Sequence, residues 1–520
     1  MASELRQPGR KTRRQRDEPD RRRRAYLFGA VAVGVIVLLT AAGALAMHVL
    51  GGREAERAPL NDAPVAVAPA PIVPTPAPTP APVTPPPPRA PVERPPDPPP
   101  PAPMPEVKPP MPEGKPPMPE AKPPMPVVPP IRAEANVNRA IERGLAHLKQ
   151  RVARTNRADI RFGRFNVSGV AESALIGLTL LECGVPAEDK QVQELATAVR
   201  AEQATLMHTY ALALGIIFLD RLAAGGNDPA LIQAFALRLA AGQSSMGAWS
   251  YGCPVLTEAE EKKFADYLRA NAPSKGMSAG REVNADLLPP RLKNCGVARW
   301  RRGAKPPSGI DWLASGDNSN AQFALLALWI AQRHGAPIQA SLAFVDHYFR
   351  HTTLRDGGWG YSPPSVRGPD NYPATAAMTC AGLLALAVGH GLAIQIDDPN
   401  RVAVLADPAI TRGFASLERR IKTLPLARPT AFGALDTREF YLYWSIERVA
   451  VMYDRQIIGD KDWYAWMSRR LVELQQADGG WDKETYNDCF ALLILRRVNI
   501  AKDLTASLKT SLDQKEKKKD

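Results

Sequence analysis

The sequence predicts an all-α domain built from a repeated pair of helices, and three observations support this. Between residues 137 and 505 the chain alternates apolar segments rich in Ala and Leu with amphipathic segments. The apolar segments are hydrophobic on nearly every side, which is typical of buried helices. Glycine and tryptophan recur together where an amphipathic segment ends, and the alternating β-branched runs typical of strands are scarce.

Composition divides the 520 residues into parts with different physical characters. Most of the 52 prolines fall between residues 59 and 130, in a stretch with almost no aromatic residues, and such a stretch cannot bury a core. We therefore expect five parts in chain order: a basic tail at 1–24, a membrane helix at 25–50, a proline-rich stalk at 51–131, a helical domain at 132–505 with an insertion at about 253–312, and a charged tail at 506–520.

An apolar run from Tyr26 to Leu50 contains no Asp, Glu, Lys or Arg and is long enough to cross ~30 Å of hydrocarbon. Arg21–Arg24 stand directly before it, and positive residues stay on the cytoplasmic side. The pattern predicts a single-pass inner-membrane protein with a cytoplasmic N-terminus and a periplasmic C-terminal domain. The alternative is a signal peptide cleaved after Ala46, which would also export the domain.

The proline-rich stalk favours the extended polyproline II helix, because proline fixes φ. At ~3.1 Å per residue, some seventy residues would reach on the order of 200 Å. The repeats KPPMPEG and KPPMPEA alternate lysine with glutamate, which keeps the segment soluble with little net charge. The stalk therefore predicts a long spacer between the bilayer and the helical domain.

The net charge of +13 is uneven, since the N-terminal tail holds much of the excess. The helical domain is only mildly basic and has no basic stripe, so a nucleic-acid partner is not expected. Its five cysteines have no CxxC spacing. Cys253 and Cys295 flank the polar insertion, and both a disulfide between them and separate free thiols remain open.

The glycine–tryptophan turns are the most specific pattern in the domain. They read QQADGGW at 475–481, DGGW at 356–359 and GAW at 247–249. Together with six apolar segments, they resemble the tryptophan-containing repeats of the squalene cyclase and prenyltransferase group over most of 137–505. The resemblance implies an (α/α)6 toroid, in which six inner helices are surrounded by six outer ones. The apolar segments are 169–186, 209–222, 318–337, 376–391, 440–453 and 486–500.

The first turns of these apolar segments are mostly polar, and in a toroid the inner-helix N-termini open on one mouth. The simpler interpretation is helix capping, because Ser, Thr, Asp and Asn are preferred at helix starts. Asp317 and Asp488 are the candidate catalytic acids. The candidate ligand-binding residues are His208, Tyr210, Asn318, Asn320, Trp359, Tyr361, Thr379 and Tyr443.

The chemistry of the resembled group is not matched residue by residue. The Asp-x-Asp-Asp acid motif of the cyclases is absent, and Asp488 and Cys489 are adjacent where the prenyltransferase zinc ligands stand two apart. No cofactor is favoured; zinc on Asp488, Cys489 and His208 is the weak alternative. We therefore expect a non-catalytic binding or scaffold module, with an unknown ligand or an envelope protein as its partner, tethered to the bilayer by residues 25–50. The alternative is an enzyme acting on a prenyl or terpenoid substrate.

Other ionisable residues in the apolar segments have structural interpretations. Glu447 and Arg448 are expected to form a buried or half-buried pair between helices. His334 and His390 each precede a glycine near the end of an apolar segment. There a protonated histidine favours the helix dipole and the glycine caps the helix.

Overall fold

The computed structural model describes residues 130–154, 169–274, 285–300, 316–363, 373–423 and 438–513. The described part is all-α apart from one short hairpin, in which β1 (Ile457–Ile458) pairs antiparallel with β2 (Lys461–Asp462). The basic tail, the expected membrane helix and nearly all of the stalk lie outside the described residues.

Six apolar helices, the core helices, fall within the six apolar segments or overlap them closely. They contact one another in chain order, α4 with α6, α6 with α11, α11 with α13, α13 with α15 and α15 with α17. The last of them, α17, also contacts the first, α4, so the order of contacts closes. Their bounds are Gly169–Glu182 (α4), Thr209–Leu222 (α6), Asn318–Ala331 (α11), Ala376–Gln395 (α13), Arg438–Met452 (α15) and Thr485–Leu495 (α17).

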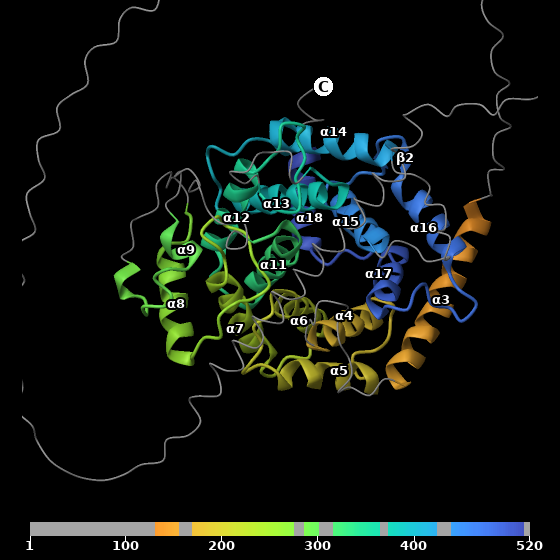
Figure 1. Ribbon diagram of the computed structural model, residues 1–520, viewed down its shortest axis with the longest axis horizontal. Coiled ribbons are helices and arrows are strands. Elements are labelled where there is room, and N and C mark those ends of the chain that lie inside the picture. Colours follow the sequence, from red (N-terminus) through yellow and green to blue (C-terminus); the bar gives the residue numbers. More distant parts are fainter. Residues whose placement is uncertain are drawn as a thin grey trace, which may run out of the picture. The chain divides into compact units, whose positions relative to one another are not determined.

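A second set of helices, the flanking helices, packs against the core helices (Figure 1). Helix α5 contacts α4, α7 contacts α6, α12 and α14 contact α13, and α16 contacts both α15 and α17. Helix α3 lies beside α16 and α17, so the first described helix meets the last part of the domain (Figure 1). Their bounds are Pro130–Arg154 (α3), Lys190–Ala201 (α5), Asp228–Ala241 (α7), Gln339–His351 (α12), Pro408–Thr423 (α14) and Trp463–Leu474 (α16).

Smaller elements complete the described part. Within the expected insertion, α8 (Glu258–Ala270) and α9 (Gly296–Arg299) pack on α7, and η3 spans Ala285–Leu287. The turns η4 (Gln332–His334) and η6 (Val404–Ala406) follow α11 and precede α14. Helix α18 (Lys502–Asp513) packs on α13 and α15. The helical domain therefore continues into the segment that was expected to be a charged tail.

The three glycine–tryptophan turns have the same hydrogen bonds. In each, a glycine with positive φ stands two residues before a buried tryptophan, whose indole N–H donates to a carbonyl ten residues earlier in the flanking helix. The indole is thereby satisfied inside the core, as a buried polar group must be. The bonds are Trp249 to Leu239 O (2.6 Å), Trp359 to Phe349 O (2.8 Å) and Trp481 to Leu471 O (2.7 Å).

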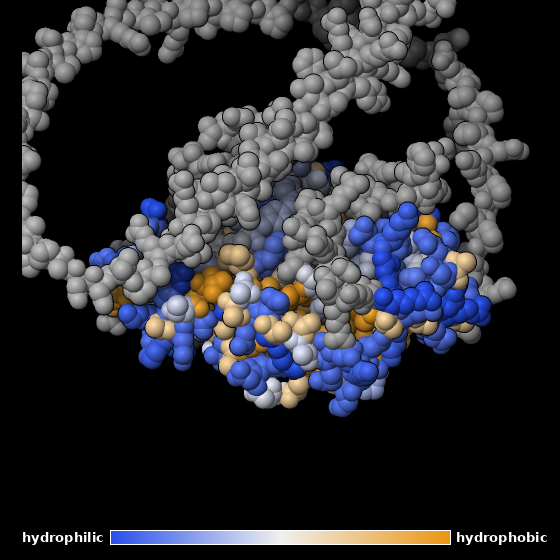
Figure 2. All heavy atoms as spheres, turned by 60° about the horizontal axis from the view of Figure 1, so that its bottom comes forward, coloured by the Kyte–Doolittle hydropathy of each residue, from blue (hydrophilic) through white to orange (hydrophobic). Residues whose placement is uncertain are grey.

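Among the described helices, α13 is long and apolar enough to cross a membrane. Of its most apolar window, 78% is buried inside the domain, against α11, α12, α14, α15 and α18. Packing between helices therefore accounts for its hydrophobicity. On the face seen in Figure 2, hydrophilic residues cover most of the described surface and hydrophobic residues gather across its middle.

Candidate functional site

An aromatic patch lies at the N-terminal ends of core helices α6 and α11. The His208 ring lies 5.9 Å from the Tyr210 ring and 5.8 Å from the Tyr251 ring, measured between centroids. The hydroxyls of Tyr251 and Tyr361 are hydrogen bonded at 2.9 Å. Tyr251 and Tyr361 are each 39% exposed and the neighbouring Met207 is 54% exposed. We call Met207, His208, Tyr210, Tyr251 and Tyr361 the aromatic patch.

Backbone hydrogen bonds between successive repeats hold the aromatic patch together. The amide of Thr209, at the start of α6, donates to the carbonyl of Tyr251, in the loop that follows the Trp249 turn. The amide of Asn318, at the start of α11, donates to the carbonyl of Tyr361 in the same way. Each loop thus satisfies an N–H group that the helix start leaves free, and its tyrosine is carried to the helix end.

Beneath the aromatic patch, side chains of four core helices fill the space between the helices. Ser319 accepts a hydrogen bond from the Tyr210 hydroxyl at 2.7 Å and shares another with Tyr441 at 2.8 Å. Deeper, the Phe323 and Phe490 rings lie 4.9 and 4.8 Å from the Trp444 ring. These rings pack on one another at the spacing of aromatic pairs, so the described side chains plug this end of the domain.

Asp317 lies directly under the patch and serves as the N-cap of α11. Its carboxylate accepts the backbone N–H and the side-chain amide of Asn320, each at 2.8 Å. Burial raises its pKa, and the hydrogen bonds from Asn320 and Tyr361 oppose that rise. Asp317 therefore makes the contacts expected of a helix N-cap, and it is also hydrogen bonded to Tyr361 of the patch.

Asp488, the other candidate acid, lies at a structural junction. It accepts the backbone N–H of Trp481 at 2.7 Å and pairs with Arg151 of α3 at 3.2 Å. The neighbouring Cys489 is hydrogen bonded to Thr179, and burial raises the pKa of its thiol. His208 belongs to the aromatic patch instead. The described residues contain no cluster of three His, Cys, Asp or Glu side chains placed to hold a metal ion.

The ligand-binding candidates predicted from the sequence divide into two groups: one group is engaged in contacts with other parts of the domain, and the other lies in the aromatic patch. Asn318 donates to the carbonyl of Gly360 and accepts from the Tyr348 hydroxyl, both at 2.8 Å, while Asn320 binds Asp317. Trp359 is buried in its turn, and its backbone N–H donates to Thr379. Tyr443 faces α16, where its ring lies 5.2 Å from Trp466. Of the eight ligand-binding candidates, the structure therefore brings His208, Tyr210 and Tyr361 together in the patch.

Met207 was not among the candidates predicted from the sequence, which all came from one end of the core helices or from the turns. No local sequence pattern marks Met207 as part of the patch, because the contact of its backbone carbonyl with the Cys253 amide forms only in the folded chain. Cys253 and Cys295 are both free thiols, as are the other three cysteines. Burial raises the pKa of Cys253 to about 12 and that of Cys295 to about 11.

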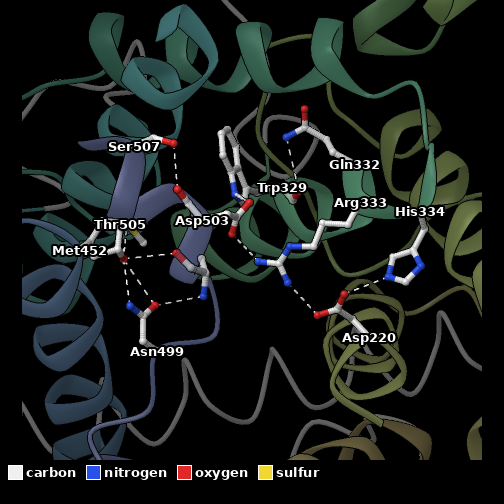
Figure 3. A network of polar contacts seen from close by, with 11 residues as sticks. Asp220, Trp329, Gln332, Arg333, His334, Met452, Asn499, Asp503, Thr505 and Ser507 are labelled. Atoms are coloured by element: carbon white, nitrogen blue, oxygen red, sulfur yellow. Dashed lines mark hydrogen bonds and ion pairs between the residues drawn. The ribbon is translucent and has the colours of Figure 1, made fainter. Parts of the chain in front are cut away.

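A cavity of about 270 Å³ lies at the opposite, C-terminal ends of core helices α4, α6 and α11. Next to it, Arg333 bridges Asp220 and Asp503, and His334 contacts Asp220 at 2.9 Å (Figure 3). The indole of Trp329 also donates to Asp503, at 3.0 Å. The cavity is lined by Glu182, Ile217, Asp220, Arg221, Ala223, Arg333, Asn499, Ile500 and Lys502.

Glu447 and Arg448 are both buried on α15, but they do not form the ion pair expected from the sequence. None of the carboxylate oxygens of Glu447 or the guanidinium nitrogens of Arg448 has a hydrogen-bond partner within the described part of the chain. Successive helix positions point about 100° apart, which separates the two groups. Burial raises the pKa of Glu447 and lowers that of Arg448 to about 9.

Arg448 instead stacks on an aromatic ring. Its guanidinium carbon lies 3.1 Å from the centre of the Trp444 ring and 5.7 Å from that of Phe323. A desolvated cation–π contact contributes about 2 kcal/mol, whereas burying an ion costs several kcal/mol. The stacking therefore leaves part of the cost of burying this cation uncompensated.

No protein-family model matches the chain, and none of the curated proteins searched matches it. The resemblance to the squalene cyclase and prenyltransferase group thus stays a prediction from the repeats.

Proposed function

We propose that this protein is a membrane-tethered binding module with the α/α-toroid architecture of the squalene cyclase and prenyltransferase group. The closed order of contacts among the core helices supports the toroid, as does the flanking helix packed beside each of them. The three identical tryptophan turns support a fold made by repetition. The apolar run at 25–50 and the proline-rich stalk support the tether.

The aromatic patch is the observation that carries the binding function. The partly exposed rings of Tyr251 and Tyr361 suit a ligand that stacks on aromatic faces and offers hydroxyl groups. The interior beneath the patch is filled by Phe323, Trp444 and Phe490, so the ligand would lie on the surface. A saccharide fits this chemistry, and an extracytoplasmic domain on a long stalk would meet the glycan strands of the cell wall.

This proposal predicts that the full-length protein, purified in detergent, binds a soluble N-acetylglucosamine hexamer. Tyr251→Ala and Tyr361→Ala should each weaken binding about tenfold, which corresponds to loss of one ring contact of about 1.4 kcal/mol. Isothermal titration calorimetry measures this. Leu287→Ala, which removes an exposed side chain outside the patch, should bind as wild type. Equal affinity of all four proteins, or no binding by wild type, would contradict the proposal.

The alternative function is catalysis on a prenyl substrate, and Asp317 favours it. A buried carboxyl group with a raised pKa beside aromatic rings is suited to donate a proton to an alkene. Incubation of the full-length protein with squalene or farnesyl diphosphate, followed by mass spectrometry of the extract, tests this. A product that Asp317→Asn abolishes while the melting temperature stays unchanged would favour the enzyme over the binding module.

A further inference from the structure

Three rings of the aromatic patch lie at the corners of a nearly equilateral triangle. The centroid of the His208 ring is 5.9 Å from that of Tyr210 and 5.8 Å from that of Tyr251, and the two tyrosine centroids are 6.1 Å apart. A cation above the middle of this triangle would lie within ~6 Å of all three centroids, which is the range of cation–π contacts. The spacing of the rings therefore suits one cationic group.

The tyrosine hydroxyls of the patch turn their protons towards the interior. Tyr361 is hydrogen bonded to the carboxylate of Asp317, which can only accept, so the Tyr361 hydroxyl is the donor. Its second bond, to the Tyr251 hydroxyl at 2.9 Å, is therefore donated by Tyr251. The Tyr210 hydroxyl donates to Ser319. These hydroxyls consequently offer only lone pairs to a ligand, so they favour a ligand that donates hydrogen bonds.

Asp317 places a negative charge beneath the patch. Each of its carboxylate oxygens accepts a hydrogen bond from Asn320 at 2.8 Å, which favours the charged form and opposes the effect of burial. Burial first, and then the charge of Asp317, raise the pKa values of Tyr210, Tyr251 and Tyr361. The field of the carboxylate therefore reaches all three tyrosines of the patch.

The aromatic patch itself adds no positive charge that would repel a cation. Burial lowers the pKa of His208, so this residue is neutral at pH 7. The first amides of α6 and α11, those of Thr209 and Asn318, are each covered by a loop carbonyl. The full charge of Asp317 also exceeds the partial positive charge of roughly half a unit at the start of α11.

We propose that the aromatic patch binds the ammonium group of an amino sugar, such as a glucosamine unit without its acetyl group in a glycan strand. This inference rests on the binding function proposed above and names the group that the ligand carries. The ammonium group lies over the triangle of rings, where the charge of Asp317 attracts it and the tyrosine lone pairs accept its N–H groups. A neutral acetamide at the same position lacks the attraction between charges.

The test compares choline with 3,3-dimethylbutan-1-ol, which has the same shape and hydroxyl group but a neutral carbon in place of the ammonium nitrogen. Saturation-transfer NMR of the full-length protein, titrated with each compound at pH 7, gives the two dissociation constants. Choline should bind about tenfold more tightly. Asp317→Asn should bring the two constants to within about twofold of each other. Asp398→Asn, which removes a carboxylate from the loop after α13, should keep the preference for choline.

Tyr361→Phe provides a second variant if Asp317→Asn does not fold. It keeps the ring but breaks the hydrogen-bonded link between Tyr251 and Asp317, so the preference for choline should fall about threefold. Competition then tests the sugar. The glucosamine hexamer should displace choline at a concentration about tenfold below that of the N-acetylglucosamine hexamer.

Three results would overturn the proposal: equal affinity of the wild-type protein for choline and its neutral analogue, a preference that neither variant reduces, or equal displacement by the two hexamers. If the N-acetylglucosamine hexamer still binds in calorimetry, these results refute the selection of an ammonium group and leave the binding function intact. Absence of binding by every compound would contradict both.

Discussion

Asp407 is a buried carboxylate held in its charged form by a histidine and an arginine from neighbouring helices. His390 of α13 and Arg350 of α12 each contact its Oδ2 atom at 2.9 Å, and the backbone N–H of Ala409 donates to Oδ1 at 2.8 Å. Burial opposes ionisation, but the contacts of His390 and Arg350 outweigh it and hold the pKa of Asp407 below its ordinary value. The residue therefore joins three helices through one charge.

This lowered pKa predicts a loss of stability in acid. A carboxylate whose pKa is lower in the folded state stabilises the fold above its unfolded pKa, near 4, and that contribution disappears as the pH falls towards the folded pKa. Asp407→Asn should lower the free energy of unfolding by about 3 kcal/mol at pH 7. Its stability should then fall less steeply than that of wild type between about pH 5 and pH 2.

Urea denaturation across this pH range measures both effects. Asp398→Asn is the matched control, because Asp398 lies in a polar loop where it accepts the backbone N–H of Asn400. This variant should follow the wild-type profile. Parallel profiles for wild type and Asp407→Asn would show that Asp407 does not carry the acid-sensitive charge.

The sequence placed His390 and His334 near helix ends but did not reveal which residues they contact. His390 was expected at a helix C-terminus with Gly391 as the cap, but α13 continues to Gln395. Gly391 is needed for close packing instead, since a Cβ there would lie 2.3 Å from Leu504. His334 fits the expectation better, because Gly335 follows it with a φ of +78°. The partners Asp407 and Asp220 lie in other segments, which the local sequence does not reveal.

At the scale of the element, the tryptophan turn is a unit that places a flanking helix against a core helix. Gly357 has a φ of +83°, and a Cβ at this position would lie 2.6 Å from the backbone carbonyl of Arg412 in α14. The turn therefore needs glycine for two reasons, its conformation and the close approach of α14.

Gly357→Ala should consequently destabilise the domain by more than the conformational strain alone. The matched control is Gly184→Ala, where φ is +87° but no atom lies within 4 Å of the new Cβ. We expect a loss of about 1 kcal/mol for Gly184→Ala and about 3 kcal/mol for Gly357→Ala. Chemical denaturation measures both, and equal losses would show that α14 yields to the added methyl group.

At the scale of the whole molecule, the described domain closes where its first helix, α3, packs against α16 and α17. Arg151 and His147 of α3 both approach Asp488 at the start of α17. Gln475, before the Trp481 turn, donates to the carbonyl of Ala140 in α3 at 2.8 Å. The contacts that hold the two ends of the domain together therefore join residues more than three hundred positions apart.

The tether predicts where the whole protein is found in the cell. Expressed in a Gram-negative bacterium, the full-length chain should remain in the membrane pellet after an alkaline carbonate wash, because the proposed tether places the 25–50 segment across the bilayer. External protease should remove the helical domain from spheroplasts. A version that begins at residue 51 provides the control and should be absent from the pellet. A soluble product that lacks residues 1–46 would establish cleavage in place of the anchor.

The sequence by itself determined the all-α class and the positions of the core helices and of the glycine–tryptophan turns. These features depend on the local hydrophobic periodicity and on the conformations open to glycine. Both are properties of short stretches of the chain. It also indicated His208, Tyr210 and Tyr361 as candidates for one site.

Only the tertiary structure decided which polar residues are committed to other contacts. It showed Asp317 and Asp488 capping helices or turns, Glu447 and Arg448 buried without a mutual ion pair, and a cavity at the C-terminal ends of the core helices. The physical reason is distance along the chain. Hydrogen bonds, ion pairs and cavities between helices depend on neighbours that only the fold brings together.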